Sequence, residues 1–457
     1  MKIEIHPEIV QKHNVSGPRY TSYPPVPNFS SDVGEKEYIE YLSSHKVTPK
    51  ISLYFHIPFC KSLCYYCGCN VVITQNQEII ERYLKYLKKE VELVLSYLKS
   101  DHVVHQLHWG GGTPNFLSLN QIEDLFLFIK EHFVIDPHAE ISIELDPRTT
   151  KKEQLQLLKN LGFNRISFGV QDINDEVQVS VHRIQPVELI EELYYSARDL
   201  GFDSINMDFI YGLPYQTKSS YENNLIKILE WKPDRLAFFS YAHVPWIKKH
   251  QKLIPLEKLP SPLEKIQIFK NIVETLTENG YIYIGLDHFA KPEDELSKAF
   301  LQKKLHRNFQ GYTVLDSMDV IAFGITAIGQ FQNLYIRNKK GLEEYRKTLD
   351  LNKLPIHDGY QMNFDDILRR DVILKIMCNL YVDFSEIEET YRIKFYEYFH
   401  NSIQKLKPLI EDGLIEIENH QLKILPNGRP LIRNVAMAFD AFLENKKDQK
   451  PIYSKTI

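Results

Sequence analysis

Residues 54–69 read YFHIPFCKSLCYYCGC and place four of the five cysteines of this chain within ten residues. The spacing is C-x3-C-x2-C-x-C, over Cys60, Cys64, Cys67 and Cys69. A [4Fe–4S] cluster normally takes four cysteine ligands, whereas the first three thiolates here can surround one iron–sulfur cube in a single short loop. One iron would then stay open for a small chelating molecule, much as a catalytic zinc keeps an open position for substrate.

Two other interpretations of the loop are a zinc knot and a disulfide. A structural zinc loop usually pairs two cysteines with a distant second pair or with histidines, and no such partner appears in the sequence. A disulfide is less compatible still, because five cysteines without a secretory signal favour a reducing compartment. We therefore expect metal-binding thiols in a cytoplasmic protein.

The composition excludes several classes of protein. The 457 residues are 43% hydrophobic and 25% charged, which are ordinary globular values. No apolar run approaches the roughly 18 residues of a membrane span, so no membrane association is expected. A formal net charge of −5 argues against a nucleic-acid partner, which needs a basic face. Nothing in the sequence demands a second subunit, so the expectation is a monomer.

Alternating strand and helix patterns follow the first 50 residues. The segments that read as strands are 51–57, 103–108, 140–145, 165–170, 203–209 and 235–240. Helices are predicted after each of them, at 76–98, 120–133, 151–161, 187–200, 218–230 and 262–279. This alternation implies an α/β fold with a parallel sheet. Six such units without a dinucleotide fingerprint favour a partial (β/α)6 barrel, although periodicity alone leaves closure of the barrel open. A further strand is predicted at 281–285.

The chain divides into three parts, an extended N-terminal segment over 1–50, the barrel and its extension over 51–340, and a mostly helical domain over 341–457. In the last part, helices at 369–378, 384–391 and 393–406 precede a hairpin over 412–417 and 421–425, which is a winged-helix-like order. We expect a structural or lid role for it, because no dense basic cluster suggests DNA binding. Residues 17–25 form either a strap over the outside of the barrel or a flap that closes over a planar ligand.

Several glycine or polar residues follow predicted strands, where α/β barrels place their chemistry. The run Gly110-Gly111-Gly112-Thr113-Pro114 is either a tight turn or a place where the backbone approaches a ligand. Glu144, Asp208 and Gln171 lie at or near strand ends, where a carboxylate can hold a ribose diol or an ammonium group. Any one of them alone is more often a helix cap or an ion-pair partner. Cys378 lies in a helical stretch and is expected to be a buried apolar residue.

The cysteine spacing, with Tyr54 and Tyr66 around it, resembles the radical S-adenosylmethionine (SAM) superfamily, in which a glycine-rich motif after the second strand binds the amino-acid end of SAM. A longer resemblance is to the branch of that superfamily that acts on porphyrinogens. It is carried by GPRYTSYP at 17–24, HWGGGTP at 108–114, ISIELDPR at 141–148, GVQD at 169–172, DFIYGLP at 208–214, LDHFAKP at 286–292 and HRNFQGYT at 306–313. The resemblance implies a partial (β/α)6 radical-SAM barrel.

The resemblance also implies a [4Fe–4S] cluster with one open iron, held by Cys60, Cys64 and Cys67, and two molecules of SAM. The positions that match the SAM on the open iron are Tyr54, Tyr66, Gly111, Glu144 and Ile328. The positions that match the second SAM are Gly112, Thr113, Gln171, Arg183, Asp208 and Ala242. The family commonly has Phe where this chain has Tyr66, so a side-chain packing role there would leave a hydroxyl to be accommodated.

The activity implied by the resemblance is the oxygen-independent decarboxylation of two propionates of coproporphyrinogen III to vinyl groups, which gives protoporphyrinogen IX. An unidentified electron donor would reduce the cluster, which then cleaves SAM. The resulting 5′-deoxyadenosyl radical would remove a hydrogen from the β-carbon of a propionate. Arg19, Arg307 and Lys291 are candidate partners of the substrate carboxylates by charge alone.

Two further residues are candidates for catalysis. His56, on the strand before the loop, is either a catalytic group or, as is more usual for a lone histidine on a strand, a satisfied core residue. Cys69, one position beyond the usual triad, is a hydrogen carrier or redox residue, a further ligand, or only a structural neighbour. Replacing it by serine would separate these roles.

Two rival functions stand beside this hypothesis. One is a haem-binding chaperone that kept the radical-SAM barrel without oxidase activity, although such relatives usually lack the fourth cysteine and the HRNFQGYT stretch. The other is a zinc-stabilised nucleic-acid-binding module that uses the C-terminal wing. Purified protein that contains zinc rather than iron would identify the second rival.

Overall fold

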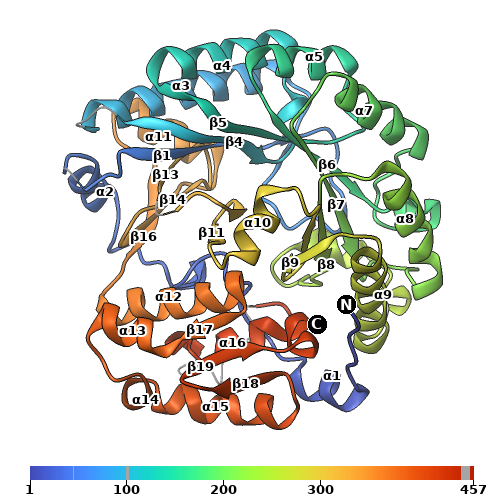
Figure 1. The fold of residues 1–457 in the computed structure, drawn as a ribbon. Helices are drawn as coiled ribbons and strands as arrows, with labels where there is room; N and C mark the ends of the chain where they lie inside the picture. The colour runs from blue at the N-terminus through green and yellow to red at the C-terminus, as the bar shows by residue number, and fades with distance from the viewer. Residues whose placement is uncertain (45, 99–101, 317, 444–452) are drawn as a thin grey trace.

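The structure, a computed structural model, describes residues 1–44, 46–98, 102–316, 318–443 and 453–457. Within these residues a sheet of twelve strands runs in the order β16-β15-β14-β13-β1-β4-β5-β6-β7-β8-β10-β9. Figure 1 shows the sheet curving through the upper part of the molecule, with helices along its outer side and the C-terminal domain, in orange and red, packed beneath it. The fold is therefore a curved α/β sheet with a helical C-terminal domain.

Neighbouring strands at the centre of the sheet are parallel. They are β13 (Asp319–Phe323), β1 (Lys50–Ile57), β4 (Val103–Gly111), β5 (Val134–Leu145), β6 (Arg165–Gln171), β7 (Ser204–Tyr211) and β8 (Arg235–Ser240). The strands β1 and β4 to β8 match the six strands that the sequence predicts, which confirms the parallel α/β arrangement. The strand β13, which pairs with β1 from Ile51↔Asp319 to Phe55↔Phe323, is an addition that the sequence does not predict.

The predicted helices pack on the outer side of this sheet. They are α3 (Gln77–Tyr97), α4 (Leu119–His132), α5 (Lys152–Leu161), α7 (Val187–Asp199), α8 (Lys218–Trp231) and α9 (Pro262–Glu278), and a short helix α6 (Asp175–Ser180) precedes α7. The helix α3 begins where the side chain of Asn76 accepts a hydrogen bond from the Glu78 N–H, which is a common N-cap arrangement. Its residues Ile80, Leu84 and Leu87 are buried on one face, as the helical period predicts.

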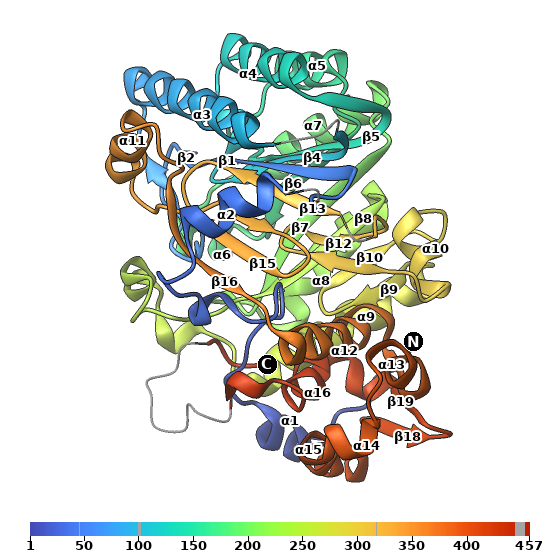
Figure 2. The ribbon, with the colours of Figure 1, turned by 90° about the vertical axis from the view of Figure 1, so that its left-hand side faces the viewer.

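Both edges of the sheet are antiparallel. The strand predicted at 281–285 is β9 (Ile282–Gly285), which reaches the sheet through β10 (His288–Ala290), and β10 runs antiparallel to β8. On the other edge, β14 (Ile328–Gln330), β15 (Leu334–Asn338) and β16 (Ile356–Gln361) are antiparallel, and α11 (Leu342–Asp350) connects β15 to β16. Figure 2 shows β15 and β16 crossing the side of the molecule toward the C-terminal domain. The large sheet thus runs on to Gln361, beyond the residue 340 at which the sequence suggests a boundary.

The C-terminal domain begins with α12 (Phe364–Asn379) and α13 (Phe384–Tyr391). The predicted hairpin is β18 (Ile415–Glu418) and β19 (Gln421–Ile424), and β17 (Tyr381–Asp383) adds a third strand to it. The helix predicted over 393–406 is divided into α14 (Phe395–Tyr398) and α15 (His400–Glu411). Phe399 lies between the two, and its ring packs in the core against Phe395 and Phe439.

The N-terminal segment 17–25 belongs to the core of the C-terminal domain, not to the outside of the barrel. Tyr20 and Tyr23 are buried with the side chains of that domain. The Tyr20 hydroxyl donates to Asp440 over 2.9 Å, and Arg433 Nε donates to the Pro18 carbonyl over 2.9 Å. Two buried aromatic rings therefore fix the segment, and the half-buried Arg19 reaches toward the barrel.

In the part of the chain that is described, no helix is both long and apolar enough to cross a membrane.

Glu90 on α3 links the barrel to its extension. Its carboxylate accepts hydrogen bonds from the Gly324 N–H (2.8 Å), from Asn338 Nδ2 (2.5 Å) and from the Tyr345 hydroxyl. These partners lie after β13, on β15 and on α11, so one side chain holds three elements. Burial raises the pKa of Glu90 to about 7, although the three hydrogen bonds act in the opposite direction.

Replacing Glu90 by glutamine should change how stability depends on pH. Because the pKa of Glu90 in the folded protein lies above its ordinary 4.5, the wild type has additional stability below pH 4.5 that is lost as the pH rises through about 7. Glutamine stays neutral, so its altered hydrogen bonding shifts stability by the same amount at every pH. The free energy of unfolding of the wild type minus that of E90Q should fall by up to roughly 3 kcal/mol between about pH 5 and 8. Denaturant titrations across this range measure the difference, and a constant difference would contradict the account.

Candidate active site

The cysteine loop is fastened to the glycine turn at the carboxyl end of the neighbouring strand. The loop leaves β1 through β2 (Phe59–Cys60), which pairs with β3 (Val72–Ile73). The N–H of Gly112 donates to the Ile57 carbonyl and the N–H of Thr113 donates to the Phe59 carbonyl, each over 2.9 Å. Thr113 Oγ1 lies 3.2 Å from Cys60 Sγ. The turn thus positions the first cysteine through both backbone and side chain.

The sulfur of Cys64 is buried beside two guanidinium groups. Arg148 Nη2 lies 3.4 Å and Arg183 Nη1 3.7 Å from Cys64 Sγ. Asp146 holds both arginines, with its Oδ2 at 2.6 Å from Arg148 and 3.1 Å from Arg183. Arg183 also donates to the Gly169 carbonyl at the end of β6. Two oriented positive charges beside a thiol suit a ligand that carries negative charge when it binds iron.

The third and fourth cysteines interact with each other. A hydrogen bond from the Cys69 thiol lowers the pKa of Cys67 to about 6, and the same interaction raises the pKa of Cys69. Cys69 is exposed, whereas Cys64 is buried and the other two are half-buried.

The sequence indicates no function for the residues that hold this part of the loop. Lys248 donates to the Cys69 carbonyl, His250 to the Cys67 carbonyl and Gln251 to the Tyr66 carbonyl, over 2.8, 2.8 and 3.1 Å.

His56 has hydrogen-bond partners at both ring nitrogens. Its Nδ1 lies 3.1 Å from the Tyr54 hydroxyl and its Nε2 lies 3.2 Å from the Asn70 carbonyl. Burial lowers the pKa of His56, so the neutral ring donates to the carbonyl and accepts from the hydroxyl. Gly111, with φ +116°, packs against this ring, and a Cβ there would lie 2.5 Å from it. This geometry is that of a satisfied histidine that holds Tyr54 and the loop in place.

Two carboxylates face the interior of the barrel. Glu144 on β5 accepts from the Gly111 N–H over 3.0 Å, and its Oε1 lies 3.5 Å from His108 Nε2. Burial opposes its ionisation, but the bonds from His108 and Gly111 lower the pKa of Glu144. Asp208 on β7 accepts from Ser167 Oγ (2.9 Å) and from Asn206 Nδ2 (2.7 Å), and burial raises its pKa to about 6. Both line one cavity of about 190 Å³ inside the barrel.

The other candidate residues come from separate elements. Gln171 is the last residue of β6, with φ +68° at a bulge against β7. Ala242 follows β8, and its carbonyl accepts from Gln251 over 3.2 Å. Ile328 begins β14, whose neighbour β13 pairs with β1. Burial raises the pKa of Tyr66 well above its ordinary value, so its additional hydroxyl stays neutral.

The residues present fit an iron–sulfur cluster better than a single metal ion. Over the described ranges, no three His, Cys, Asp or Glu side chains converge as the ligands of one ion would. All ligands of a structural zinc bind the same ion, so their donor atoms lie close together. The thiolates of a cluster each bind a different iron, so their sulfur atoms lie further apart. Three thiols on one loop are a donor set that can hold a cluster, and the two arginines beside Cys64 favour its thiolate form.

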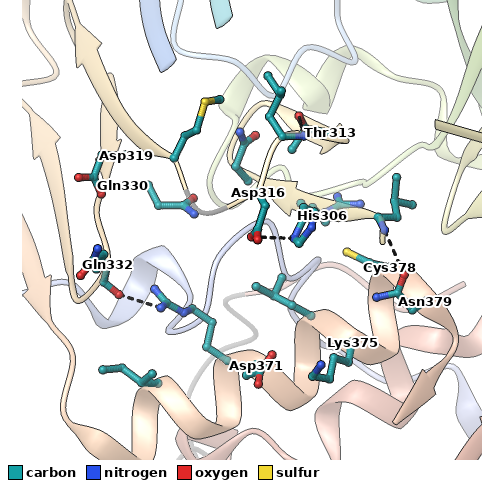
Figure 3. A pocket seen from close by; sticks show the side chains of 18 of the residues that line it. His306, Thr313, Asp316, Asp319, Gln330, Gln332, Asp371, Lys375, Cys378 and Asn379 are labelled. Carbon is teal, nitrogen blue, oxygen red and sulfur yellow. Dashed lines mark hydrogen bonds and ion pairs between the residues drawn. The ribbon is translucent and has the colours of Figure 1, made fainter. Parts of the chain in front are cut away.

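Figure 3 shows a second cavity, of about 430 Å³, between the 306–313 hairpin and α12. Its lining includes Asp319, which begins β13 and pairs with Ile51 at the beginning of β1, so it lies at the opposite end of the strands from the cysteine loop. Cys378 lines it and is buried, as predicted. Arg307 also lines it, over the Tyr312 ring at 4.7 Å. Lys291 pairs at 3.2 Å with Asp234, which directly precedes β8 and so lies at the end of that strand away from the cysteine loop. Neither cation therefore lies at the cysteine loop.

The sequence and fold match a known superfamily and a known enzyme. Residues 54–225 match the Radical SAM superfamily, and residues 364–431 match the HemN C-terminal domain. An oxygen-independent coproporphyrinogen III oxidase from Synechocystis is 42% identical over 461 residues, which cover 100% of this chain and 98% of the relative. An enzyme of the same name from Escherichia coli is 43% identical over 438 residues, which cover 96% of this chain and 95% of the relative.

The match extends to three dimensions. The solved structure of coproporphyrinogen III oxidase (HemN) from Escherichia coli, a radical SAM enzyme, has a TM-score of 0.91 to this structure at 40% sequence identity. It covers 97% of this chain and 100% of the solved chain, so barrel and C-terminal domain agree together. From this full-length similarity in sequence and in fold, the chain belongs to the family of oxygen-independent coproporphyrinogen III oxidases within the radical SAM superfamily.

Proposed function

We propose that this protein decarboxylates two propionates of coproporphyrinogen III to vinyl groups without oxygen, which gives protoporphyrinogen IX. The observation that carries the proposal is the loop of Cys60, Cys64 and Cys67, braced by the glycine turn at the carboxyl ends of the strands. A haem-binding chaperone without oxidase activity is not favoured, because the relatives that match over the whole length are named as oxidases. The monomeric state, the cytoplasmic location and the absence of a nucleic-acid partner stay predictions.

The cluster would be held by Cys60, Cys64 and Cys67 with one iron open. When bound, such a cluster supplies an electron to SAM and thereby the radical chemistry that removes a hydrogen from the substrate. The residues of the chain position this chemistry and keep it dry. Arg148 and Arg183 keep positive charge at Cys64, and the 241–251 segment closes over the backbone of the loop.

We further propose two SAM sites at the mouth of the barrel. The residues for the SAM on the open iron are Tyr54, Tyr66, Gly111, Glu144 and Ile328, and those for the second SAM are Gly112, Thr113, Gln171, Arg183, Asp208 and Ala242. Glu144 supports the first site, because an ionised carboxylate facing the barrel interior can pair with an ammonium group. Asp208 supports the second, because it faces the same cavity from another strand.

His56 and Cys69 have different proposed roles. We propose that His56 is a positioning residue, because its two ring nitrogens already hold Tyr54 and Asn70. We propose that Cys69 acts in turnover without being a cluster ligand, because it lies on the exposed part of the loop and its thiol bonds to Cys67. An exposed thiol at the edge of the site is accessible for hydrogen or electron transfer.

Anaerobic turnover tests the proposed function. Incubation of the purified iron-loaded protein with coproporphyrinogen III, SAM and dithionite should yield protoporphyrinogen IX, measured as protoporphyrin by chromatography after oxidation. The variant C60S, which lacks one proposed ligand, should yield none. An intact cluster that cleaves no SAM and forms no vinyl product would support the chaperone instead.

Serine at position 69 should separate ligation from turnover. We expect C69S to keep its iron and sulfide, because three other thiols hold the cluster, while its rate of vinyl formation falls by about a hundredfold if hydrogen transfer by Cys69 contributes as much as a positioned proton-transfer group usually does. Iron analysis and the turnover assay measure the two effects, with C67S as the control that loses iron. Loss of iron from C69S would make Cys69 a ligand, and unchanged turnover would make it only a structural neighbour.

Alanine at Gly111 should damage the site without unfolding the protein. A Cβ at Gly111 would lie 2.5 Å from the His56 ring, on backbone with φ +116°. The His56 ring must then move and release Tyr54, so we expect SAM binding to weaken by about tenfold or more, since such strain costs of order 1–3 kcal/mol. Equilibrium dialysis with labelled SAM measures the loss. Gly341→Ala, where a Cβ meets nothing within 4 Å, is the matched control and should bind SAM normally.

A further inference from the structure

A cavity of about 240 Å³ adjoins the carboxyl ends of β7 and β8. Its walls come from five separate parts of the chain, the N-terminal segment, the ends of both strands, the beginning of α9, the C-terminal domain and the last residues. Among the lining residues are Arg19, Gly212, Ala242, Lys265, Arg433 and Lys455. Ala242 lines the cavity, and Gln251 donates to the carbonyls of both Ala242 and Tyr66, so the cavity lies on the side of the cysteine loop.

Four cations line this cavity, and three of them, Arg19, Lys265 and Arg433, contact neutral groups near its centre, whereas the exposed Lys455 lies at its edge and reaches the Asn14 carbonyl. Arg19 Nη2 donates to the Ser240 carbonyl over 3.3 Å, and Lys265 Nζ donates to the Tyr241 carbonyl over 3.2 Å. Arg433 is 4% exposed, and its Nε, Nη1 and Nη2 donate to the carbonyls of Pro18, Lys455 and Gly17, which leaves two of its five N–H groups for a ligand. Over the described residues, these three cations have no carboxylate within 4 Å. Lysine and arginine carry more donors than these carbonyls use.

Two other arginines with little exposure, Arg183 and Arg235, have an acid beside them, whereas the buried Arg307 forms no ion pair among the described residues. Arg183 pairs with Asp146 at 3.1 Å and Arg235 pairs with Asp294 at 2.8 Å. Asp287 interacts electrostatically with both Arg19 and Arg433, but its carboxylate is paired with His288 at 2.7 Å. A buried charge without a paired acid is costly, and cations gathered in one cavity repel one another. The effect is visible at Lys265, where burial and then the charges of Arg19 and Arg433 lower the pKa to about 7.

We propose that the cavity of Arg19, Lys265 and Arg433 binds the carboxylates of substrate propionates that are not at the reacting position. The inference rests on the proposed function, since coproporphyrinogen III carries four propionates and keeps two of them in the product. A carboxylate accepts several hydrogen bonds and forms paired contacts with guanidinium groups. Two carboxylates at this site would balance most of the three positive charges while another propionate lies at the barrel interior.

Porphyrin binding tests the inference in the iron-loaded protein. The probes are coproporphyrin III, which keeps the four carboxylates in a stable oxidised ring, and its tetramethyl ester, which has the same ring and no charge. Fluorescence titration gives the affinity of the wild type, of Lys265→Met and of Arg19→Gln for each probe. The matched control is Lys298→Met, which removes an exposed lysine of α10 (Glu295–Leu301) outside the cavity.

We expect K265M and R19Q each to weaken binding of the acid by about tenfold, as for loss of a charged hydrogen bond, and to change binding of the ester by less than about twofold. K298M should bind both probes like the wild type. The use of two variants and an uncharged probe separates lost recognition from poor folding, because a misfolded variant loses both probes. Equal losses for acid and ester in both variants, or no loss for the acid, would overturn the inference.

The two proposals fail in different ways. If the wild type turns over coproporphyrinogen III and the variants bind the acid normally, the carboxylates lie elsewhere and the proposed function stands. If the wild type neither binds coproporphyrin III nor forms vinyl product, both are overturned.

Discussion

A few hydrogen bonds between the cysteine loop and the glycine turn place the chemistry of this protein. Two backbone bonds join Gly112 and Thr113 to the carbonyls of Ile57 and Phe59, and the Thr113 hydroxyl meets Cys60. Only glycine permits this approach at position 112, because a Cβ there would lie 2.6 Å from the backbone of Pro58. The contact joins the ends of β1 and β4, neighbours in the parallel sheet. The sheet therefore determines where the thiols lie, and the turn determines how they face.

Around this contact, charge is distributed in two ways. On the side of the cluster, Asp146 binds both arginines beside Cys64, so the positive charge there is oriented and partly balanced. On the side of the proposed substrate cavity, the hydrogen bonds of Arg19, Lys265 and Arg433 to described residues all go to carbonyl groups, and Arg19 also lies 6.0 Å from the centre of the Phe239 ring. We interpret the first arrangement as one that stabilises thiolates that stay bound to the cluster. We interpret the second as a site that binds an anionic ligand reversibly.

The sequence predicted the parts of the molecule that depend on local pattern. Six strands and their helices follow from hydrophobic periodicity, and the cysteine spacing and the glycine run lie within short stretches. It did not predict β13, which has five buried residues and lies far along the chain from its partner β1. A short run of buried residues has no periodicity that distinguishes a strand from a turn of buried helix. Lys248, His250 and Gln251 were missed for a related reason, since they bind the loop from an irregular segment. Of the cationic cavity, charge alone suggested Arg19 but not Lys265 or Arg433, because these residues come from distant segments. Charge also suggested Lys291, which is paired with Asp234.

The central claim is that one iron of the cluster is left free by the protein and is taken by SAM. Mössbauer spectroscopy of the anaerobic, iron-57-loaded protein, recorded with and without SAM, tests it most directly. We predict that SAM shifts the signal of a single iron site toward higher coordination and leaves the other sites unchanged. A spectrum that SAM does not alter, or a loop that holds zinc in place of iron, would contradict the account.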